Sequence, residues 1–221
     1  MKKPNDSQNM NENSLSRRVL SEQIKEIIIE SILNGEFKAG DRVAENTIAR
    51  KLGVSQAPVR DAIRDLVMLG FLESEAYRGA TVRKFTSEEL NEVYLIRAAL
   101  ESLGARLAVT RVTEGDAKAL RKLLDDMITA ALENNLALFV RLDTEFHEQI
   151  MKMSGNRHLH QMWKSLQFGY WTLITARTSK FGLEFLARRH SEVLSALLTR
   201  DPKKAIEEME HHFKALGSPL E

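Results

Sequence analysis

Residues 55–62 of this 221-residue chain read SQAPVRDA, and this segment decides how the first part of the chain folds. Serine is a good N-cap, and Pro58 falls in the first helical turn, where a missing N–H costs nothing. The segment therefore predicts a helix that opens at its serine and runs to Leu69. A short helix over about residues 45–52 precedes it, and Gly53 breaks the chain between the two.

Two short extended pieces follow that helix, at residues 71–75 and 80–84, and residues 76–79 join them as a hairpin. Two short helices with a glycine turn, followed by a hairpin, have the order of a winged helix-turn-helix. An earlier helix begins near Ser16. We therefore predict an α+β DNA-binding domain over residues 16–84, after a polar, disordered tail over residues 1–15.

Helical periodicity dominates the rest of the chain. Residues 86–89 (TSEE) resemble a cap before a long helix. Glycine, asparagine or Asp-Pro breaks separate six expected helices, at residues 87–110, 113–134, 136–154, 156–179, 182–200 and 202–215. The expected fold class is mainly α: a winged helix-turn-helix followed by an all-α six-helix bundle over residues 87–215.

The composition restricts the class of protein. The chain has no cysteine, so it has neither disulfides nor thiolate metal sites. No apolar run approaches the roughly 18 residues of a membrane span, and the N-terminus has no apolar signal segment. We expect a cytoplasmic protein with no membrane partner. The formal net charge is only +1, which argues against binding DNA without regard to sequence, because such binding depends on neutralising phosphates.

The helix that starts at residue 55 carries the DNA-reading candidates. Gln56, Arg60 and Arg64 recur every four residues and so share one face. Glutamine pairs with adenine and arginine with guanine in a major groove, and a helix N-terminus holds a phosphate. The alternative is a solvated face on which Arg64 pairs with neighbouring aspartates. With the hairpin tip included, the predicted DNA-binding residues are Ser55, Gln56, Arg60, Arg64, Tyr77, Arg78 and Gly79.

Asp143 and His147 lie four positions apart, so they project from one face of a helix and could chelate a divalent cation. Hydrogen bonding on the helix surface explains the same spacing. His190 and His212 follow on later helices, and periodicity alone does not say whether they converge or are exposed.

Several segments resemble a known family. Residues 55–62 are similar to the "S-R-T-P-V-R-E-A-L" signature of GntR-type transcriptional regulators, and residues 40–45, 69–72 and 78–82 are similar to its "G-x-x-L-x-E", "E-G-L-V" and "R-G-A-x-V" pieces. Arg60 matches the DNA-contacting arginine of the family. The family often has arginine where this chain has Gln56, and a different residue often stands at Asn46, so a different operator sequence is expected.

The C-terminal region resembles the effector domain of the FadR subfamily, in its smaller six-helix, VanR-type variant. Residues 97–101, 142–147 and 154–156 match its "R-x-x-L-E", "D-x-x-F-H" and "S-G-N" pieces, while Arg189 stands where the family usually has Glu. The resemblance implies one divalent metal, with Zn²⁺ or Ni²⁺ suited to three imidazoles and a carboxylate. The implied ligands are Asp143, His147, His190 and His212, whereas His211 is one position out of register.

The resemblance also implies a small carboxylate effector near the metal. An arginine fork suits a carboxylate, although Arg97 could simply pair with Glu101, and Trp171 could be core. The candidate effector-binding residues are Arg97, Tyr94, Trp171 and Arg177.

The predicted function is therefore a homodimeric transcriptional regulator that binds operator DNA under the control of a small effector. The alternative is a metalloenzyme with an accessory DNA-binding domain, since a metal held by three histidines and an aspartate could activate water. No H-E-x-x-H or G-x-S-x-G motif supports catalysis.

Overall fold

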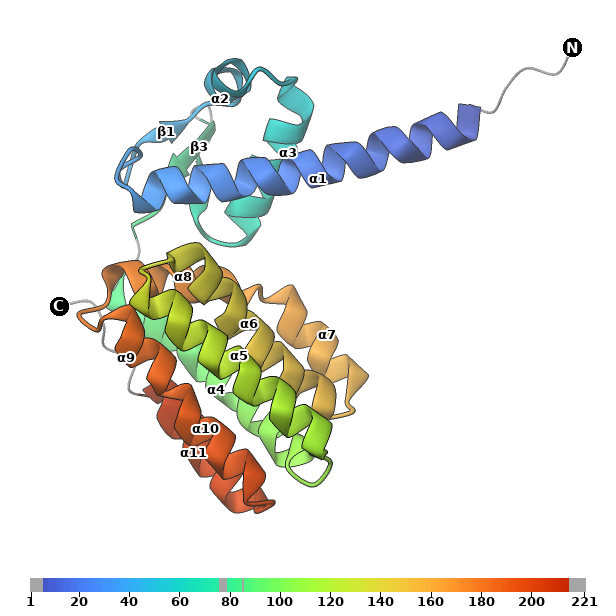
Figure 1. The fold of residues 1–221 in the computed structure, drawn as a ribbon. Coiled ribbons are helices and arrows are strands. Elements are labelled where there is room, and N and C mark those ends of the chain that lie inside the picture. Colours follow the sequence, from blue (N-terminus) through green and yellow to red (C-terminus); the bar gives the residue numbers. More distant parts are fainter. Residues whose placement is uncertain (1–5, 76–78, 85, 215–221) are drawn as a thin grey trace, which may run out of the picture. The chain divides into compact units, whose positions relative to one another are not determined.

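The computed structural model describes residues 6–75, 79–84 and 86–214. The chain forms two compact units, Met1–Lys84 and Phe85–Glu221 (Figure 1). The expectation of a mainly helical protein with a small sheet near its N-terminus is confirmed. Each unit has its own core and is described by itself.

The first unit has the order of a winged helix-turn-helix. Its strands form an antiparallel sheet in the order β1-β3-β2, in which Leu72 pairs with Val82 and Val43 with Ala80. Gly53 has a left-handed φ of 67°, which makes the turn between the two short helices. The elements are α1 (Asp6–Leu33), β1 (Arg42–Val43), α2 (Glu45–Leu52), α3 (Gln56–Met68), β2 (Leu72–Glu75) and β3 (Gly79–Val82).

Helix α1 differs from its prediction in where it begins. It begins at Asp6, ten residues before the expected start, so residues 6–15 are helical and not a disordered tail. Extending an existing helix adds one hydrogen bond for each residue fixed, which favours propagation into a polar segment once the apolar turns have formed. The composition of the segment could not reveal this.

The core of the first unit forms where α1 and α3 pack together. Ile24 and Ile28 of α1 are buried, as are Val59 and Leu66 of α3. Val59 and Leu66 thus mark the inner face of α3, and the opposite face carries the DNA-reading candidates.

The second unit is a bundle of helices in which α4 packs along α11, and α5 along α6 (Figure 1). Capping boxes start two of its helices: Thr86 and Glu89 bond reciprocally at α4, and Thr113 and Asp116 at α5. The helices are α4 (Ser87–Ala108), α5 (Glu114–Leu132), α6 (Leu136–Met153), α7 (Arg157–Ser165), α8 (Phe168–Thr178), α9 (Leu183–Arg188), α10 (His190–Leu198) and α11 (Pro202–Lys214).

Two expected helices are each divided in the structure. The helix expected over residues 156–179 breaks at Gln167, whose φ of 47° is left-handed and ends the regular bonding between α7 and α8. The helix expected over residues 182–200 is interrupted at Arg189, between α9 and α10. Neither position carries glycine or proline, so no breaker residue marks them in the sequence. The described part of the second unit therefore has eight helices where six were expected.

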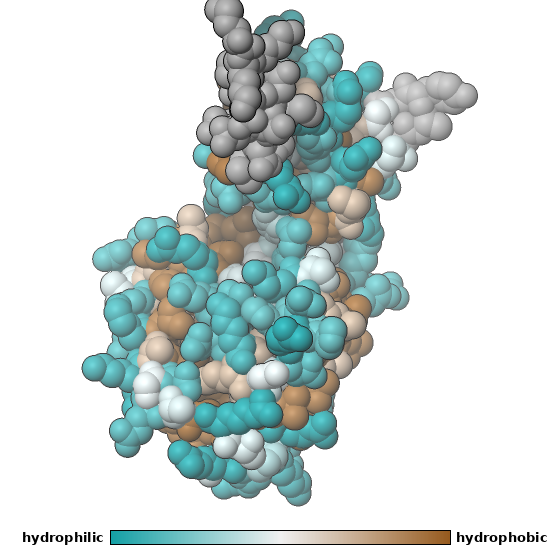
Figure 2. Space-filling model, turned by 90° about the vertical axis from the view of Figure 1, so that its right-hand side faces the viewer, coloured by the Kyte–Doolittle hydropathy of each residue, from teal (hydrophilic) through white to brown (hydrophobic). Residues whose placement is uncertain are grey.

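No helix of the described residues is long and apolar enough to cross a membrane. Figure 2 shows one face of the molecule, on which hydrophilic and hydrophobic residues are interspersed.

Candidate DNA-binding surface and metal centre

Helix α3 presents the predicted reading residues to solvent. Gln56, Arg60 and Arg64 are all exposed on the face opposite its buried side. Ser55 occupies the N-cap position with extended backbone, but its side chain makes no capping hydrogen bond. The serine thus starts the helix as predicted, without using its hydroxyl to do so.

The arginines of this face differ in their partners. Arg60 Nε donates to Glu45 Oε2 on α2 at 3.0 Å. Asp61 pairs with Arg17 of α1 at 2.6 Å, and the described residues contain no ion pair to Arg64. The local pairing of Arg64 with aspartates, weighed above as an alternative, is therefore absent from the described part of the chain.

Of the predicted DNA contacts in the wing, only Gly79 lies within the described residues. Gly79, at the start of β3, has a left-handed φ of 84° and lies with Gln56 around a shallow hollow between the sheet and α3. The other two predicted wing residues, Tyr77 and Arg78, lie outside the described residues.

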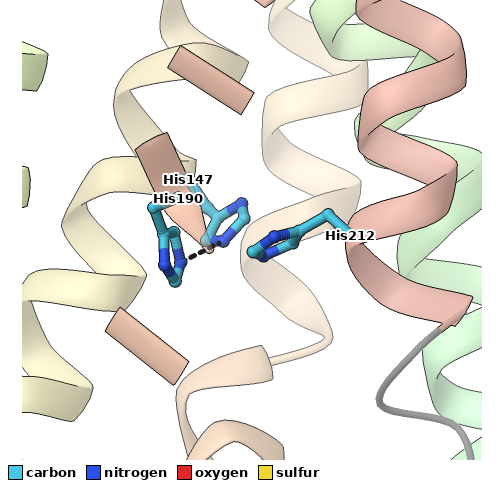
Figure 3. Close-up of side chains that lie close together, drawn as sticks. All are labelled: His147, His190 and His212. Atoms are coloured by element: carbon cyan, nitrogen blue, oxygen red, sulfur yellow. Dashed lines mark hydrogen bonds between the residues drawn. The ribbon is translucent and has the colours of Figure 1, made fainter. Parts of the chain in front are cut away.

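Three histidines from three helices converge inside the second unit (Figure 3). His147 lies on α6, His190 begins α10, and His212 lies near the end of α11, and all three are buried. One ring nitrogen from each lies within 4.8 Å of the others, and the Nε2 atoms of His147 and His190 are 3.1 Å apart. His211, by contrast, is exposed and faces Glu208, so it lies away from this centre, as predicted.

Groups behind two of the rings fix their orientation. His147 Nδ1 lies 2.5 Å from Glu101 Oε2, which leaves Nε2 facing the centre. His190 Nδ1 donates to the carbonyls of Leu186 and Ala187 at 3.1 and 3.0 Å, so its Nε2 also faces the centre. Such partners set the tautomer and direction of a metal-binding imidazole.

A buried ion network joins α4 to α6 beside the histidines. Arg97 Nε donates to Glu101 Oε1 at 2.8 Å, and its Nη2 lies 3.4 Å from Asp143 Oδ2. Asp143 Oδ1 in turn lies 3.1 Å from His190 Nε2. Thr172 of α8 accepts from Arg97 at 2.9 Å and donates to Asp143 at 3.0 Å. The expected pairing of Arg97 with Glu101 is confirmed.

The network keeps both carboxylates ionised in spite of their burial. Burial raises the pKa of Glu101, but the facing His147 and Arg97 outweigh it and lower that pKa to about 2. Burial also opposes ionisation of Asp143, yet the His190 hydrogen bond and the Arg97 charge hold its pKa well below the ordinary value. Burial lowers the pKa of His147 and of His212, which favours the neutral imidazoles that a metal requires.

The donor set fits a divalent metal ion. Within the described residues His212 Nδ1 is buried without a hydrogen-bond partner, and an unpartnered buried polar atom costs free energy unless something binds it. The other donors are two imidazoles and one ionised carboxylate, a set that suits Zn²⁺ or Ni²⁺. Of the four residues implied as ligands, His147, His190 and His212 lie together, and Asp143 contacts His190 at 3.1 Å.

A small cavity of about 20 Å³ adjoins the histidines. Of the four predicted effector residues, Tyr94 and Arg97 line it, and Tyr94 bonds Thr175 Oγ1 at 2.6 Å. Trp171 instead packs against the apolar cluster around Trp163, and Arg177 is exposed. Since successive helical residues point about 100° apart, turning Thr172 and Thr175 inward directs these two side chains elsewhere. Neither Trp171 nor Arg177 lines this cavity, and their part in effector binding stays a prediction.

Sequence reasoning also missed three residues of the site. Glu101 was considered only as a partner of Arg97, Thr172 was not singled out, and Arg189 was noted only as a departure from the family pattern. The four-residue spacing of Arg97 and Glu101 matches that of Asp143 and His147, so two such pairs on packed helices offered a signal for Glu101. No comparable signal marks Thr172.

A winged helix-turn-helix joined to an all-helical unit with a buried polar centre defines the class of DNA-binding transcriptional regulators. Residues 20–82 match the domain described as bacterial regulatory proteins, gntR family, and residues 92–215 match the FCD domain. The chain therefore belongs to the GntR family of bacterial regulatory proteins and carries an FCD domain.

Individual relatives agree with this assignment. The chain is 32% identical to a protein of Paenarthrobacter nicotinovorans named as a probable D-xylose utilization operon transcriptional repressor, across 91% of this chain and 88% of that protein. It is 29% identical to an HTH-type transcriptional regulator of Bacillus subtilis across 82% of each chain. The solved structure of Escherichia coli McbR/YncC has the same fold, with a TM-score of 0.66, 23% identity, and coverage of 89% of this chain and 96% of that one. These relatives are regulators and not enzymes, so the metalloenzyme alternative has no support.

The depressed pKa of Glu101 predicts a loss of stability in acid. The pKa of this carboxyl group falls from 4.5 in the unfolded chain to about 2 in the folded protein. Its ionised form therefore stabilises the fold fully at pH values above 4.5, by on the order of 3 kcal/mol. This stabilisation is lost as the pH falls to the folded-state pKa. We expect the free energy of unfolding of the metal-free protein to decrease between pH 4.5 and pH 2, and to do so less steeply in Glu101→Gln.

Urea titrations followed by tryptophan fluorescence would measure this. Both tryptophans, Trp163 and Trp171, lie in the helical unit, and Trp163 Nε1 donates to Glu101 Oε1 at 2.7 Å. Glu145→Gln, at an exposed carboxylate of α6, is the matched control. Equal pH dependence in the wild type and Glu101→Gln would contradict the prediction.

Proposed function

We propose that this transcriptional regulator changes its operator affinity when a small carboxylate binds beside a divalent metal in the FCD domain. The observation that carries the proposal is the buried convergence of His147, His190 and His212 next to Asp143. A homodimer is expected, because a two-fold symmetric operator mirrors a two-fold symmetric protein.

The exposed face of α3 is the proposed reading surface. Gln56, Arg60 and Arg64 would face base edges, and Ser55 with the helix N-terminus would hold a phosphate. The hydrogen bond that Arg60 donates to Glu45 would orient the guanidinium before DNA binds. Tyr77, Arg78 and Gly79 remain the proposed contacts of the wing.

The proposed metal ligands are Asp143, His147, His190 and His212. A bound Zn²⁺ or Ni²⁺ would supply a positive charge and an open coordination position able to accept a carboxylate oxygen. Glu101 would orient His147, and the carbonyls of Leu186 and Ala187 would orient His190. The metal would also join α6, α10 and α11, which contribute one histidine each.

The balance of buried charge favours an anionic effector. Arg97, Arg189, Glu101 and Asp143 carry two positive and two negative charges, which cancel when the imidazoles are neutral. A divalent cation would leave two surplus positive charges in and around the site, which a bound anion would partly compensate. Of the four effector-binding candidates from the sequence, Tyr94 and Arg97 lie in the cavity wall.

The DNA-reading role of Arg60 predicts a specific loss of affinity. We expect Arg60→Ala to weaken binding to the operator by roughly 10- to 100-fold, the value of one good base contact, with little change on random DNA. Lys122→Ala, an exposed ion-paired cation on α5, should change neither. Gel-shift titrations at one salt concentration measure both affinities. Unchanged operator affinity in Arg60→Ala would contradict the assignment, and equal wild-type affinity for random DNA would favour sequence-indifferent binding.

The metal site predicts loss of the bound ion from a double variant. Protein in which His147 and His190 are both replaced by alanine should retain no stoichiometric metal after dialysis, because two of four ligands are gone. The matched control is His158→Ala with His211→Ala, at two histidines outside the centre, which should retain the wild-type content. Elemental analysis by mass spectrometry measures this, and stoichiometric metal in the first variant would refute the site.

The carboxylate effector is tested with a matched pair of sugars. The name of the Paenarthrobacter relative refers to D-xylose utilization, so we compare D-xylose with D-xylonate, which carries a carboxylate that D-xylose lacks. We expect an anion such as D-xylonate, citrate or acetate to raise the melting temperature of the metal-loaded protein and to change its operator affinity in a gel shift. Stabilisation by D-xylose and by no carboxylate would overturn the effector class.

A further inference from the structure

Arg189 is a second guanidinium in the wall of the cavity beside the histidines. It lies at the junction of α9 and α10, directly before His190, and lines the cavity together with Arg97 and Tyr94. Its side chain is partly buried and passes over the ring of Phe185 at 5.9 Å. The position is therefore inside the proposed effector site, although sequence reasoning gave it no role there.

The two arginines of the cavity differ in their charge compensation. The charge of Arg97 is compensated within the protein, because its guanidinium donates hydrogen bonds to Glu101, Asp143 and Thr172. Arg189 donates to a neutral group, the backbone carbonyl of His212. Glu192 and Glu208 are near enough to act on its charge, but no carboxylate of the described residues forms an ion pair with it. A partly buried guanidinium that no carboxylate contacts directly can form such a contact with an incoming carboxylate.

The adjacent arginine shows that the lack of an ion pair is not a general property of this segment. Arg188, one position earlier, is exposed and pairs with Glu184 at 2.8 Å. Arg189 thus differs from its neighbour in forming no ion pair among the described residues.

We propose that Arg189 is the residue that binds the carboxylate of the effector, in place of the Arg97 and Arg177 suggested by the sequence. The inference rests on the proposed carboxylate-controlled function and assigns its specificity to one side chain. The planar guanidinium would donate two parallel hydrogen bonds to the carboxylate oxygens. Small organic acids are therefore the expected ligand class, and neutral sugars are not.

The size of the cavity links this contact to α11. A space of about 20 Å³ holds little more than one water molecule, so a carboxylate enters only if the wall moves. The bond from Arg189 to the carbonyl of His212 is part of that wall. Transferring the guanidinium from this carbonyl to the effector would release α11, which packs along α4, the first helix after the DNA-binding unit. The effector would thus bind the two states of α11 with different affinity, as a switch requires.

The test compares Arg189→Gln, Arg189→Lys and Arg189→Glu with the neighbouring control Arg188→Gln. Each protein is saturated with Zn²⁺, and its Kd for acetate, citrate and D-xylonate is measured by calorimetry. Zn²⁺ affinity is measured separately by competition with a chromophoric chelator. We expect Arg189→Gln to bind the carboxylates about 10- to 100-fold more weakly than wild type, and Arg189→Lys to retain part of the affinity. Arg189→Glu should abolish binding, while Arg188→Gln stays within twofold and Zn²⁺ affinity is unchanged in all.

Three outcomes would overturn the inference. Carboxylate affinity in Arg189→Gln within twofold of wild type would exclude the contact but leave the proposed function standing. A parallel loss of Zn²⁺ affinity in Arg189→Gln and Arg189→Lys would assign Arg189 a structural role in holding His212. Absence of carboxylate binding to wild type would refute both this inference and the proposed effector class.

Discussion

The structure of the helical unit depends on one buried ion network, in which Arg97 and Glu101 of α4 face Asp143 and His147 of α6. Charges taken out of water are costly, and removing one partner of such a pair commonly destabilises a protein by about 3–5 kcal/mol. The network therefore fixes the register of α4 against α6. Helices held together by apolar contacts alone would tolerate small shifts that this network forbids.

The other helices add to this fixed pair. Thr172 brings α8 into the network, and His190 brings α10 through its contact with Asp143. His212 of α11 joins them with a buried nitrogen that has no protein partner in the described part of the chain. The arrangement keeps two acids ionised and favours neutral imidazoles, which is the state that binds a metal. The polar centre thus organises the bundle and also supplies its chemistry.

The DNA-binding unit follows a different principle. Its core is apolar, formed by residues such as Ile28, Leu66 and Phe71, and its candidate functional residues are exposed and depend little on one another. This difference explains why the two units were predictable to different degrees. A surface that reads DNA can be inferred from one helix, because all its members lie on one face. A site inside a bundle requires knowing how several helices pack.

The sequence by itself determined the class of fold, the helix-turn-helix with its hairpin and the exposed face of α3. These follow from periodicity, capping and motif spacing, which are local. The four candidate metal ligands came from the resemblance of the C-terminal region to a known family, because periodicity alone did not show that the histidines converge. Tertiary structure decided that the chain breaks at Gln167 and Arg189, and that Trp171 and Arg177 lie away from the cavity. It also decided the parts played by Glu101, Thr172 and Arg189. Each of these features depends on how a helix packs against helices distant in sequence, and local sequence patterns do not encode that packing.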